Sequence, residues 1–351
     1  MGAKTPADRG KNRTRPSKPG GRVTSYDVAR HARVSQSAVS RAFKPGAHVS
    51  KKMRERVMKA ARDLGYEPNA IARSLISGRS NLVAVIISNL TNLYYPEVLA
   101  QLSQRLSARG ARVLLFTLES ESQVDETLQQ VFQYQVDGAI VAARLSREQV
   151  DEFAHRRVPL VFYNRFFRDF AVNAVCCDQV DGARQLVDGL ARSGHRRFAV
   201  IAGPADSFVG IERTQTAVQS IRERGLDIVA VLDGDYSYDC AAPALAHLAA
   251  QAGGMPDAII CANDVMAIGA IDALRFNHGL AVPKDVSVVG FDGVGPARWS
   301  SFNLTTIRQP VRRMTEAAVS MLLEHVEDPE RPPEKRLFTG QLMRGGSARL
   351  I

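Results

Sequence analysis

The sequence has no long apolar run. No segment approaches the roughly 18 consecutive apolar residues that a membrane-spanning helix requires, so we expect no membrane partner. Residues 1–21 are rich in Lys, Arg, Pro and Gly and lack the apolar region of a signal peptide. This stretch therefore predicts a disordered basic tail on a cytoplasmic protein.

Cysteine is scarce, and its spacing is not that of a metal or redox site. The cysteines Cys176, Cys177, Cys240 and Cys261 form no C-x-x-C pair. Cys176 and Cys177 are adjacent in a strand-like run, where two side chains could hardly bridge each other. We expect all four to be reduced and mostly buried, as is usual in a cytosolic protein.

Common catalytic motifs are also absent. The sequence has no G-x-S-x-G, H-E-x-x-H or G-x-x-x-x-G-K-[ST] motif, and no G-x-G-x-x-G after a predicted strand. Its seven histidines are scattered, and none is paired at metal-ligand spacing. We therefore predict no catalytic residue, no metal site and no cofactor.

Positive charge is concentrated near the N-terminus. Residues 1–80 contain 19 Lys and Arg against 5 Asp and Glu, whereas residues 81–351 contain 27 against 31. Charge alone would fit a passive, solvated basic surface equally well. The helical pattern within the basic part decides in favour of a nucleic-acid-binding module joined to a near-neutral one.

Three short helices are predicted in that basic part. Thr24 and Asp27 form a capping-box start for the first helix, whose apolar side is supplied by Tyr26, Val28, Ala29 and Ala32. Ser50 caps the third helix, in which Met53, Val57, Ala60 and Leu64 recur at helical spacing.

The second helix, starting after its cap Ser35, has the pattern of a DNA-reading helix. Its inner face contains Ala38, Val39, Ala42 and Phe43. Its outer face contains Gln36, Ser37, Ser40 and Arg41. The polar residues at the start of this helix stand where a helix-turn-helix protein meets base edges.

A short helix-like segment follows, from Asn69 to Gly78. Helices below roughly 12 residues are marginal in water, so this segment should become ordered only on a partner. An apolar side chain such as Leu75 can then be inserted between base pairs from the minor groove.

The rest of the chain alternates between strand and helix patterns. Such an order predicts parallel sheets covered by helices, and so many strands favour two similar subdomains over one sheet. The predicted strands are 82–88, 112–116, 138–142, 160–163, 174–177, 198–202, 228–232, 258–261 and 286–291. Ligands bind beyond the carboxyl ends of such strands, so polar residues in the loops that follow are candidate ligand contacts.

Two stretches carry a resemblance to a known family. Residues 24–43 (TSYDVARHARVSQSAVSRAF) and 48–75 (HVSKKMRERVMKAARDLGYEPNAIARSL) resemble the DNA-binding head and hinge of lactose-repressor-type (LacI/GalR) transcription regulators. The resemblance covers most of the chain after residue 21. It implies an all-α helix-turn-helix head on an α/β core of the periplasmic-binding-protein-like type, with two Rossmann-like subdomains and ligand between them.

The resemblance also implies domain boundaries. We expect a tail at 1–21, a head at 22–67, a hinge at 68–79 and a core at 80–351. Within the core, one subdomain would comprise about 80–177 and 308–337, and the other about 178–307 and 338–351.

The DNA contacts expected from the resemblance fall into three groups. Base edges would be read by Gln36, Ser37 and Arg41, and phosphates would be bound by Thr24, Ser25, Tyr26, Ser35, Ser40, His48 and Ser50. The hinge would present Asn69, Ala72, Arg73 and Leu75 to the minor groove. For Ser35 and Ser50 the alternative is helix capping alone, and for His48 it is simple solvent exposure.

For the effector site, the resemblance indicates Arg213 and Asp292 as the residues that hold a ligand's polar groups. The alternative is an ion pair between subdomains without a ligand. Tyr94, Tyr95 and Tyr236 could stack on a sugar ring or a base, or could simply pack in the core. The remaining candidates are Asn164, Gln309 and Asn263, with Asp264 expected to act mainly as a helix cap.

Some positions depart from the family pattern. Val209 and Ile211 stand where ligand contacts often occur, and Ser207 replaces a possible second arginine of purine-binding members. These residues favour a sugar or sugar-derived effector over a purine. Arg165 stands where the family often has an aromatic or small residue, which favours an acidic ligand.

We therefore predict a homodimeric regulator, most simply a repressor of a carbohydrate-uptake or catabolic operon, that binds a near-palindromic DNA operator and a sugar or sugar-acid effector. It would be cytoplasmic and associated with the bacterial nucleoid. The C-terminal residues 345–351 contain no leucine heptad, so no coiled-coil tetramer is expected. The alternatives are a solute-binding protein of the same core fold and an enzyme acting on a small sugar.

Overall fold

The computed structural model describes residues 23–44, 46–67, 79–88, 90, 92–118, 123–167, 169–205, 207–250 and 254–351. The chain divides into two compact units, residues 1–80 and residues 81–351. None of the helices in the described ranges is both long and apolar enough to cross a membrane.

The described residues of the first unit form three helices, α1 (Ser25–His31), α2 (Gln36–Phe43) and α3 (Lys51–Asp63). Each begins at a cap expected from the sequence, because the side chains of Thr24, Ser35 and Ser50 accept hydrogen bonds from backbone amides three residues later. Val28, Val39 and Val57 are almost completely buried and form the centre of the small core.

Tyr26 does not belong to that core. The prediction that it lies on the apolar side of the first helix is wrong, since its side chain is 67% exposed. A helix turns by about 100° per residue, so Tyr26 lies roughly 200° away from the buried Val28. It is therefore a surface residue of the head.

The predicted hinge contacts Asn69, Ala72, Arg73 and Leu75 lie outside the residues that the structure describes. The described chain resumes at Arg79, just before the first strand of the second unit.

The second unit contains two six-stranded sheets. The first has the order β11-β5-β4-β3-β1-β2 and is parallel throughout. Its strands are β1 (Leu82–Ser88), β2 (Arg112–Leu118), β3 (Gly138–Ala142), β4 (Leu160–Tyr163), β5 (Ala174–Cys177) and β11 (Lys335–Phe338). Its helices are α5 (Tyr95–Ala108), α6 (Val124–Gln133), α7 (Arg147–His155) and α12 (Val311–Glu327).

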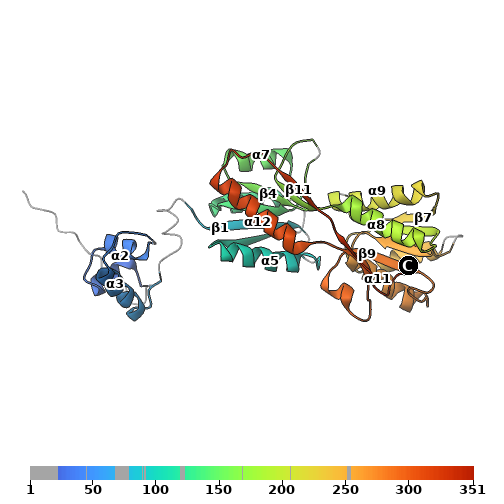
Figure 1. Ribbon diagram of the computed structural model, residues 1–351, viewed down its shortest axis with the longest axis horizontal. Helices are drawn as coiled ribbons and strands as arrows, with labels where there is room; N and C mark the ends of the chain where they lie inside the picture. The colour runs from blue at the N-terminus through green and yellow to red at the C-terminus, as the bar shows by residue number, and fades with distance from the viewer. Residues whose placement is uncertain are drawn as a thin grey trace, which may run out of the picture. The chain divides into compact units, whose positions relative to one another are not determined.

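The second sheet has the order β12-β10-β9-β8-β6-β7 and is parallel except for β12. Its strands are β6 (Arg197–Ile201), β7 (Asp227–Leu232), β8 (Ala258–Cys261), β9 (Ser287–Asp292), β10 (Thr305–Arg308) and β12 (Gln341–Met343). Its helices are α8 (Gln179–Arg192), α9 (Phe208–Glu223), α10 (Ala241–Ala249) and α11 (Asp264–Asp272), with a π-helical turn at Ala273–Asn277 and a 3₁₀ turn at Gly295–Arg298. Figure 1 shows α8 and α9 lying together over this sheet.

Both faces of the first sheet are buried, as the continuous apolar run in β1 predicts. Val83, Val85 and Ile87 pack in the core shared with α5 and α12, whereas Ala84 and Ile86 pack against α6 and α7. This alternation explains why the strand contains apolar residues at every position from Leu82 to Ile87.

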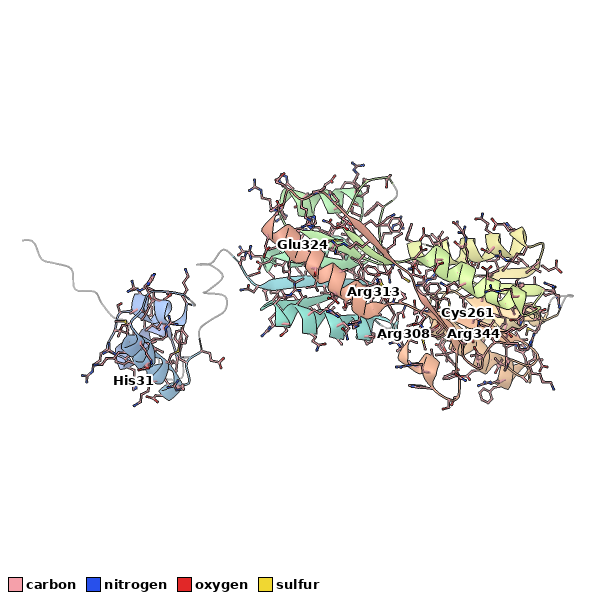
Figure 2. The ribbon with its side chains drawn as sticks, in the orientation of Figure 1. His31, Cys261, Arg308, Arg313, Glu324 and Arg344 are labelled. Carbon is pink, nitrogen blue, oxygen red and sulfur yellow. The ribbon has the colours of Figure 1, made fainter. Side chains whose placement is uncertain are left out.

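The chain passes three times between the sheets, after β5, after β10 and after β11 (Figure 1). Arg308 pairs with Asp292 in the second sheet, and Phe338 pairs with Cys177 in the first. Figure 2 shows Arg308 near the passage between the sheets, where its guanidinium lies 3.8 Å from the Glu97 carboxylate of α5.

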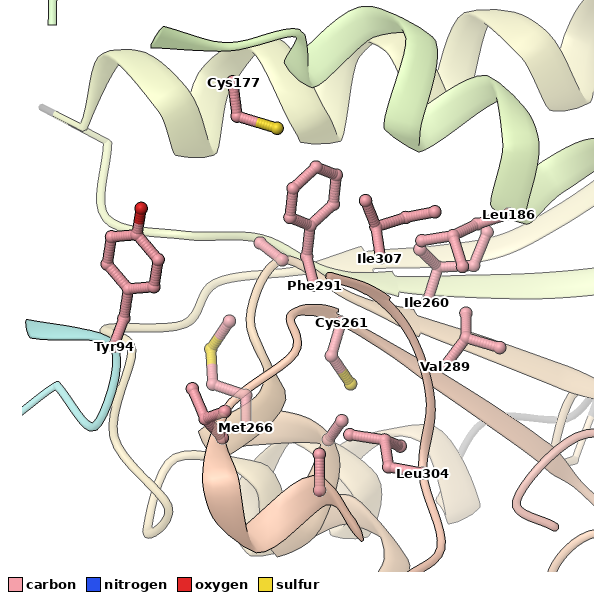
Figure 3. Packing of buried hydrophobic residues seen from close by; sticks show 14 of the residues in the cluster. Tyr94, Cys177, Leu186, Ile260, Cys261, Met266, Val289, Phe291, Leu304 and Ile307 are labelled. Atoms are coloured by element: carbon pink, nitrogen blue, oxygen red, sulfur yellow. The ribbon is translucent and has the colours of Figure 1, made fainter. Parts of the chain in front are cut away.

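The cysteines are free thiols, as the sequence predicts, and all but the half-buried Cys240 are buried. Burial raises the pKa of Cys176 and of Cys177 to about 12, so both side chains remain protonated. These residues act as packing groups, and Figure 3 shows Cys177 and Cys261 among the buried apolar side chains.

Candidate functional site

The outer face of α2 presents polar side chains on the surface of the head. Ser37, Ser40 and Arg41 are exposed, while Gln36 is half-buried and donates a hydrogen bond to the Ser25 hydroxyl over 3.3 Å. That bond ties the start of α2 to the start of α1. The face therefore has exposed donors and acceptors held on a rigid helix.

The expected phosphate contacts surround that face on the same small unit. All are exposed except Ser25, which is half-buried; the exposed ones are Thr24, Tyr26, Ser35, Ser40, His48 and Ser50. Ser35 and Ser50 act as helix caps, and this role is compatible with a phosphate contact because a cap places backbone amides nearby.

A cavity of about 220 Å³ lies at the carboxyl ends of strands from both sheets. Of the eight residues predicted for the effector site, the structure places seven in its wall: Tyr94, Tyr95, Asn164, Arg213, Tyr236, Asp292 and Gln309. Asn263 is not among the lining residues.

Arg213 and Asp292 form a buried ion pair in this wall. The Arg213 Nη2 lies 2.9 Å from the Asp292 Oδ1, and both side chains are about 5% exposed or less. Arg213 also donates to the Gln179 Oε1 and to the Ala262 carbonyl. Its guanidinium stands 3.8 Å above the ring of Phe291, which Figure 3 shows packed close to Ile307.

A hydrogen-bonded chain continues from Asp292 into the first subdomain. The side-chain amide of Gln309 donates to the Asp292 carboxylate over 2.7 Å. The side-chain oxygen Oε1 of Gln309 accepts from the Tyr94 hydroxyl and from the Asn164 side-chain amide. Burial raises the pKa of Tyr94 well above its usual value, so the phenol remains a donor. The two subdomains are thus joined through polar groups that also face the cavity.

Tyr236 closes the opposite side of the cavity. The Tyr236 hydroxyl lies 2.8 Å from the Ser207 hydroxyl. A Cβ atom added at Gly203 would lie 2.7 Å from the Tyr236 ring and hydroxyl, and one added at Gly210 would lie 2.5 Å from the hydroxyl. The tyrosine therefore requires glycine at these two positions.

Three cavity residues have unusual backbone conformations. Asn164, Tyr236 and Asp292 have positive φ values of 54°, 67° and 120°. Non-glycine residues adopt such values at a cost and are found mainly where surrounding contacts hold them, often at functional sites.

The prediction that Asp264 acts mainly as the cap of α11 is wrong, because the cap is Asn263. Asn263 is the cap of α11, accepting from the Met266 amide over 2.9 Å, and its amide group donates to the Tyr236 carbonyl. Asp264 is fully buried and accepts from the Thr306 hydroxyl and the Val294 amide. The local signal of an Asn–Asp pair at a helix start could not distinguish these two arrangements.

Asp264→Asn is expected to remove a pH-dependent loss of stability. Burial, assisted by the charge of Asp292, raises the pKa of Asp264 from 3.8 to about 7. The folded protein therefore binds more protons than the unfolded chain between these pH values, and its free energy of unfolding falls as pH rises, by at most about 1.4 kcal/mol per unit.

An Asn at this position can accept from the Val294 amide and donate to the Thr306 hydroxyl, so the contacts are retained. Urea unfolding of the core should show the variant gaining stability relative to the parent between pH 5 and pH 8. A difference that stays constant over this range would contradict the prediction.

Several lining residues were not predicted as contacts from the sequence. Leu118 ends β2, and Ala143 and Arg144 directly follow β3. Gln179 follows β5 and accepts a hydrogen bond from Arg213, but it is not among the lining residues. The signal that could have found them is their position directly after predicted strands.

Comparison with known proteins gives matches over both units. Residues 24–69 match the family described as bacterial regulatory proteins, lacI family, and residues 187–348 match the periplasmic binding protein-like domain. The HTH-type transcriptional repressor CytR of Escherichia coli (strain K12) is 30% identical over 333 residues, which cover 94% of this chain and 97% of that protein. The chain belongs to the lacI family of bacterial regulatory proteins.

Solved structures of LacI-family proteins have the same fold. A Lac repressor dimer bound to operator and the anti-inducer ONPF matches with a TM-score of 0.85 at 28% identity, over 93% of this chain and 99% of that one. A complex of the regulator CelR with cellobiose matches with a TM-score of 0.71 at 29% identity, over 93% and 100% of the chains. This LacI-family chain is a DNA-binding transcriptional regulator, and its two core sheets form a periplasmic-binding-protein-like fold. These relatives are regulators and not enzymes.

Proposed function

We propose that this protein is a repressor of a carbohydrate-uptake or catabolic operon, released from its operator by a sugar or sugar-derived effector bound in the cavity. It would act in the bacterial cytoplasm, at the nucleoid. The proposed DNA contacts on the head are Thr24, Ser25, Tyr26, Ser35, Gln36, Ser37, Ser40, Arg41, His48 and Ser50. Those on the hinge are Asn69, Ala72, Arg73 and Leu75. The proposed effector contacts are the seven lining residues Tyr94, Tyr95, Asn164, Arg213, Tyr236, Asp292 and Gln309.

The hydrogen-bonded chain through Gln309 is the observation that carries this proposal. Gln309 follows β10 of the second sheet, whereas its partners Tyr94 and Asn164 belong to the first subdomain. A ligand with several hydroxyls would compete for the same donors and acceptors, and would therefore change how the subdomains are held. The first subdomain also follows the head directly in sequence, since β1 begins at Leu82. Such a coupling must be reciprocal, so operator binding would weaken effector binding by the same factor.

A homodimer is supported by the edges of both sheets. The edge strands β2 and β7 expose the apolar side chains Leu115 and Val231, at 44% and 48%. Exposed apolar residues on unpaired edge strands are an association risk unless another surface covers them. A dimer would give two heads and hence a near-palindromic operator. Sedimentation as a single subunit would contradict this part of the proposal.

The alternatives explain less of the chain. A solute-binding protein would account for the two-sheet core but not for residues 24–69, which match the lacI family. An enzyme acting on a sugar would need a nucleophile or a base, and the polar groups around Asp292 are engaged with one another.

The direct test is binding to symmetrical DNA duplexes taken from upstream of sugar-utilisation genes. We expect the protein to prefer its operator over random DNA by at least about 10³-fold at moderate salt. Saturating effector should then lower operator affinity by roughly 5–150-fold.

Val57→Asp is the matched control, because it introduces a charge at a fully buried position of the head core. This variant should lose operator binding, while its core keeps binding the effector. If the parent protein shows no preference for any symmetrical duplex, with or without candidate metabolites, the proposed function is wrong.

A further inference from the structure

The described residues of the cavity wall carry more positive than negative charge. Among the described residues that line it, the ionised side chains are Arg144, Arg165, Arg213 and Asp292. Asp292 is paired with Arg213, and the other nitrogens of Arg213 bind Gln179 and the Ala262 carbonyl. The charge of Arg213 is therefore already balanced within the wall, and Arg165 is the arginine of interest.

Arg165 is held at the cavity by its neighbours. It directly follows Asn164, and its Nη1 donates to the Asn164 carbonyl over 2.8 Å. Burial raises the pKa of the neighbouring Tyr95, and the charge and hydrogen bond of Arg165 counteract this rise. The guanidinium thus lies beside a phenol that lines the same cavity. Within the described ranges, Arg165 has no ion pair with a carboxylate.

A second hollow of about 480 Å³ lies beyond the two arginines and shares Ala143, Arg144 and Arg165 with the first. Its other described lining residues are uncharged and mostly apolar: Leu145, Phe162, Phe166, Phe167, Ala205, Phe208, Ile211 and Gln215. Phe166 and Phe208 contact each other across the subdomains, with ring centroids 4.5 Å apart. Neither hollow therefore supplies, from its described lining, a carboxylate that would balance the charge of Arg165.

We propose that the effector carries an anionic group, a carboxylate or a phosphate, that Arg165 binds in the cavity next to Arg144; this inference rests on the proposed function. A half-buried guanidinium without a counter-ion is costly once a closing site excludes water, and a neutral hydroxyl does not balance its charge. A carboxylate or phosphate matches the planar, forked arrangement of guanidinium donors. The hydroxyls of such an effector would remain available to Asn164, Gln309 and Asp292.

The test compares neutral sugars with their acids and phosphates. The probes are aldoses, the corresponding aldonates and uronates, sugar 6-phosphates, and inorganic phosphate, all at constant ionic strength. We expect at least one anion to raise the melting temperature of the core saturably, while its neutral parent binds at least tenfold more weakly. Carboxylate and phosphate probes separate the two possible anions.

Three variants show whether Arg165 is responsible. Arg165→Gln should weaken binding of the anion by about 10–100-fold and leave the weak binding of the neutral parent unchanged. Arg165→Lys keeps the charge but not the forked arrangement of donors, so its affinity for the anion should lie between those of the parent protein and Arg165→Gln. Arg147→Gln removes the same charge from a neighbouring exposed residue that lies over Phe170 and does not line the cavity, so its effect should be small.

The proposal is overturned if a neutral sugar binds as tightly as its acid, if Arg165→Gln has no effect, or if no anion in the set stabilises the core saturably. Operator binding without effector is measured separately. A protein that binds its operator and responds only to neutral sugars refutes the anion site but not the regulator. A protein that binds an anion through Arg165 but no duplex refutes the regulator but not the anion site.

Discussion

Arg213→Met is expected to lower the free energy of unfolding of the core by about 3–5 kcal/mol, because it leaves a buried carboxylate without its counter-ion. The Asp292 side chain is only 4% exposed, and burial already raises its pKa despite the opposing effect of Arg213. Removing Arg213 raises this pKa further, so the variant should be least stable at high pH. Urea unfolding at pH 5 and pH 8 measures both effects.

Two further variants make this prediction specific. Arg224→Met, in the turn after the same helix, breaks an ion pair with Asp188 that is about one-third exposed, and should cost at most about 1 kcal/mol. The double variant Arg213→Met, Asp292→Asn should lose less stability than the sum of its single variants, because no charge is left unpaired. Equal losses in Arg213→Met and Arg224→Met would show that burial of the pair has little energetic effect.

Operator affinity is expected to fall by about 10³–10⁵-fold between 50 and 200 mM salt, as it does for proteins that neutralise six to ten phosphates. Residues 23–67 contain ten Lys and Arg against four Asp and Glu, so the head carries a net positive charge. Binding of this surface to DNA releases counter-ions, and added salt opposes that release. Fluorescence anisotropy with a labelled duplex measures the slope of log affinity against log salt.

Arg41→Ala is the informative comparison for that experiment. Arg41 is exposed on the outer face of α2, where it is proposed to read a base. Its loss should reduce discrimination between operator and random DNA by roughly 1–3 kcal/mol, while the salt slope changes little. A salt response that is flat in the parent protein would exclude phosphate contacts as the main source of affinity.

The head was predictable because its signals are local. Thr24, Ser35 and Ser50 cap the helices that immediately follow them, and the burial of Val28, Val39 and Val57 follows helical spacing. The burial of Tyr26 was predicted wrongly because its apolar ring does not reveal which way the side chain faces on a short helix.

The core was predictable where a strand is buried on both faces. Gly138–Ala142 and Ala258–Cys261 have the predicted bounds, since each is a continuous apolar run. Lys335–Phe338 and Gln341–Met343 are short strands at sheet edges with polar residues. They were not predicted as strands because their conformation depends on partners such as Cys177 and Ile307, which are distant in sequence.

The candidate site could be predicted only in part, from the rule that ligand contacts follow the carboxyl ends of strands. Asp292 and Asn164 follow this rule and reach the cavity, whereas Asn263 also follows it but uses its side chain to cap α11. Which of two neighbouring polar residues faces a cavity is decided by competition among hydrogen bonds in the folded protein. That competition involves residues such as Thr306 and Tyr236, whose proximity the sequence does not reveal.

The passage of the chain back to the first sheet at β11 has a consequence for how the protein is made. Ala174 pairs with Lys335, so the sixth strand of the first sheet leaves the ribosome only after nearly all of the second sheet has been synthesised. The head needs only contacts within residues 23–67 and can fold long before that point. Premature termination between residues 80 and 335 would therefore release a chain with a complete DNA reader and an incomplete sensor. Quality control of such fragments would matter more here than for a protein whose sheets are continuous in sequence.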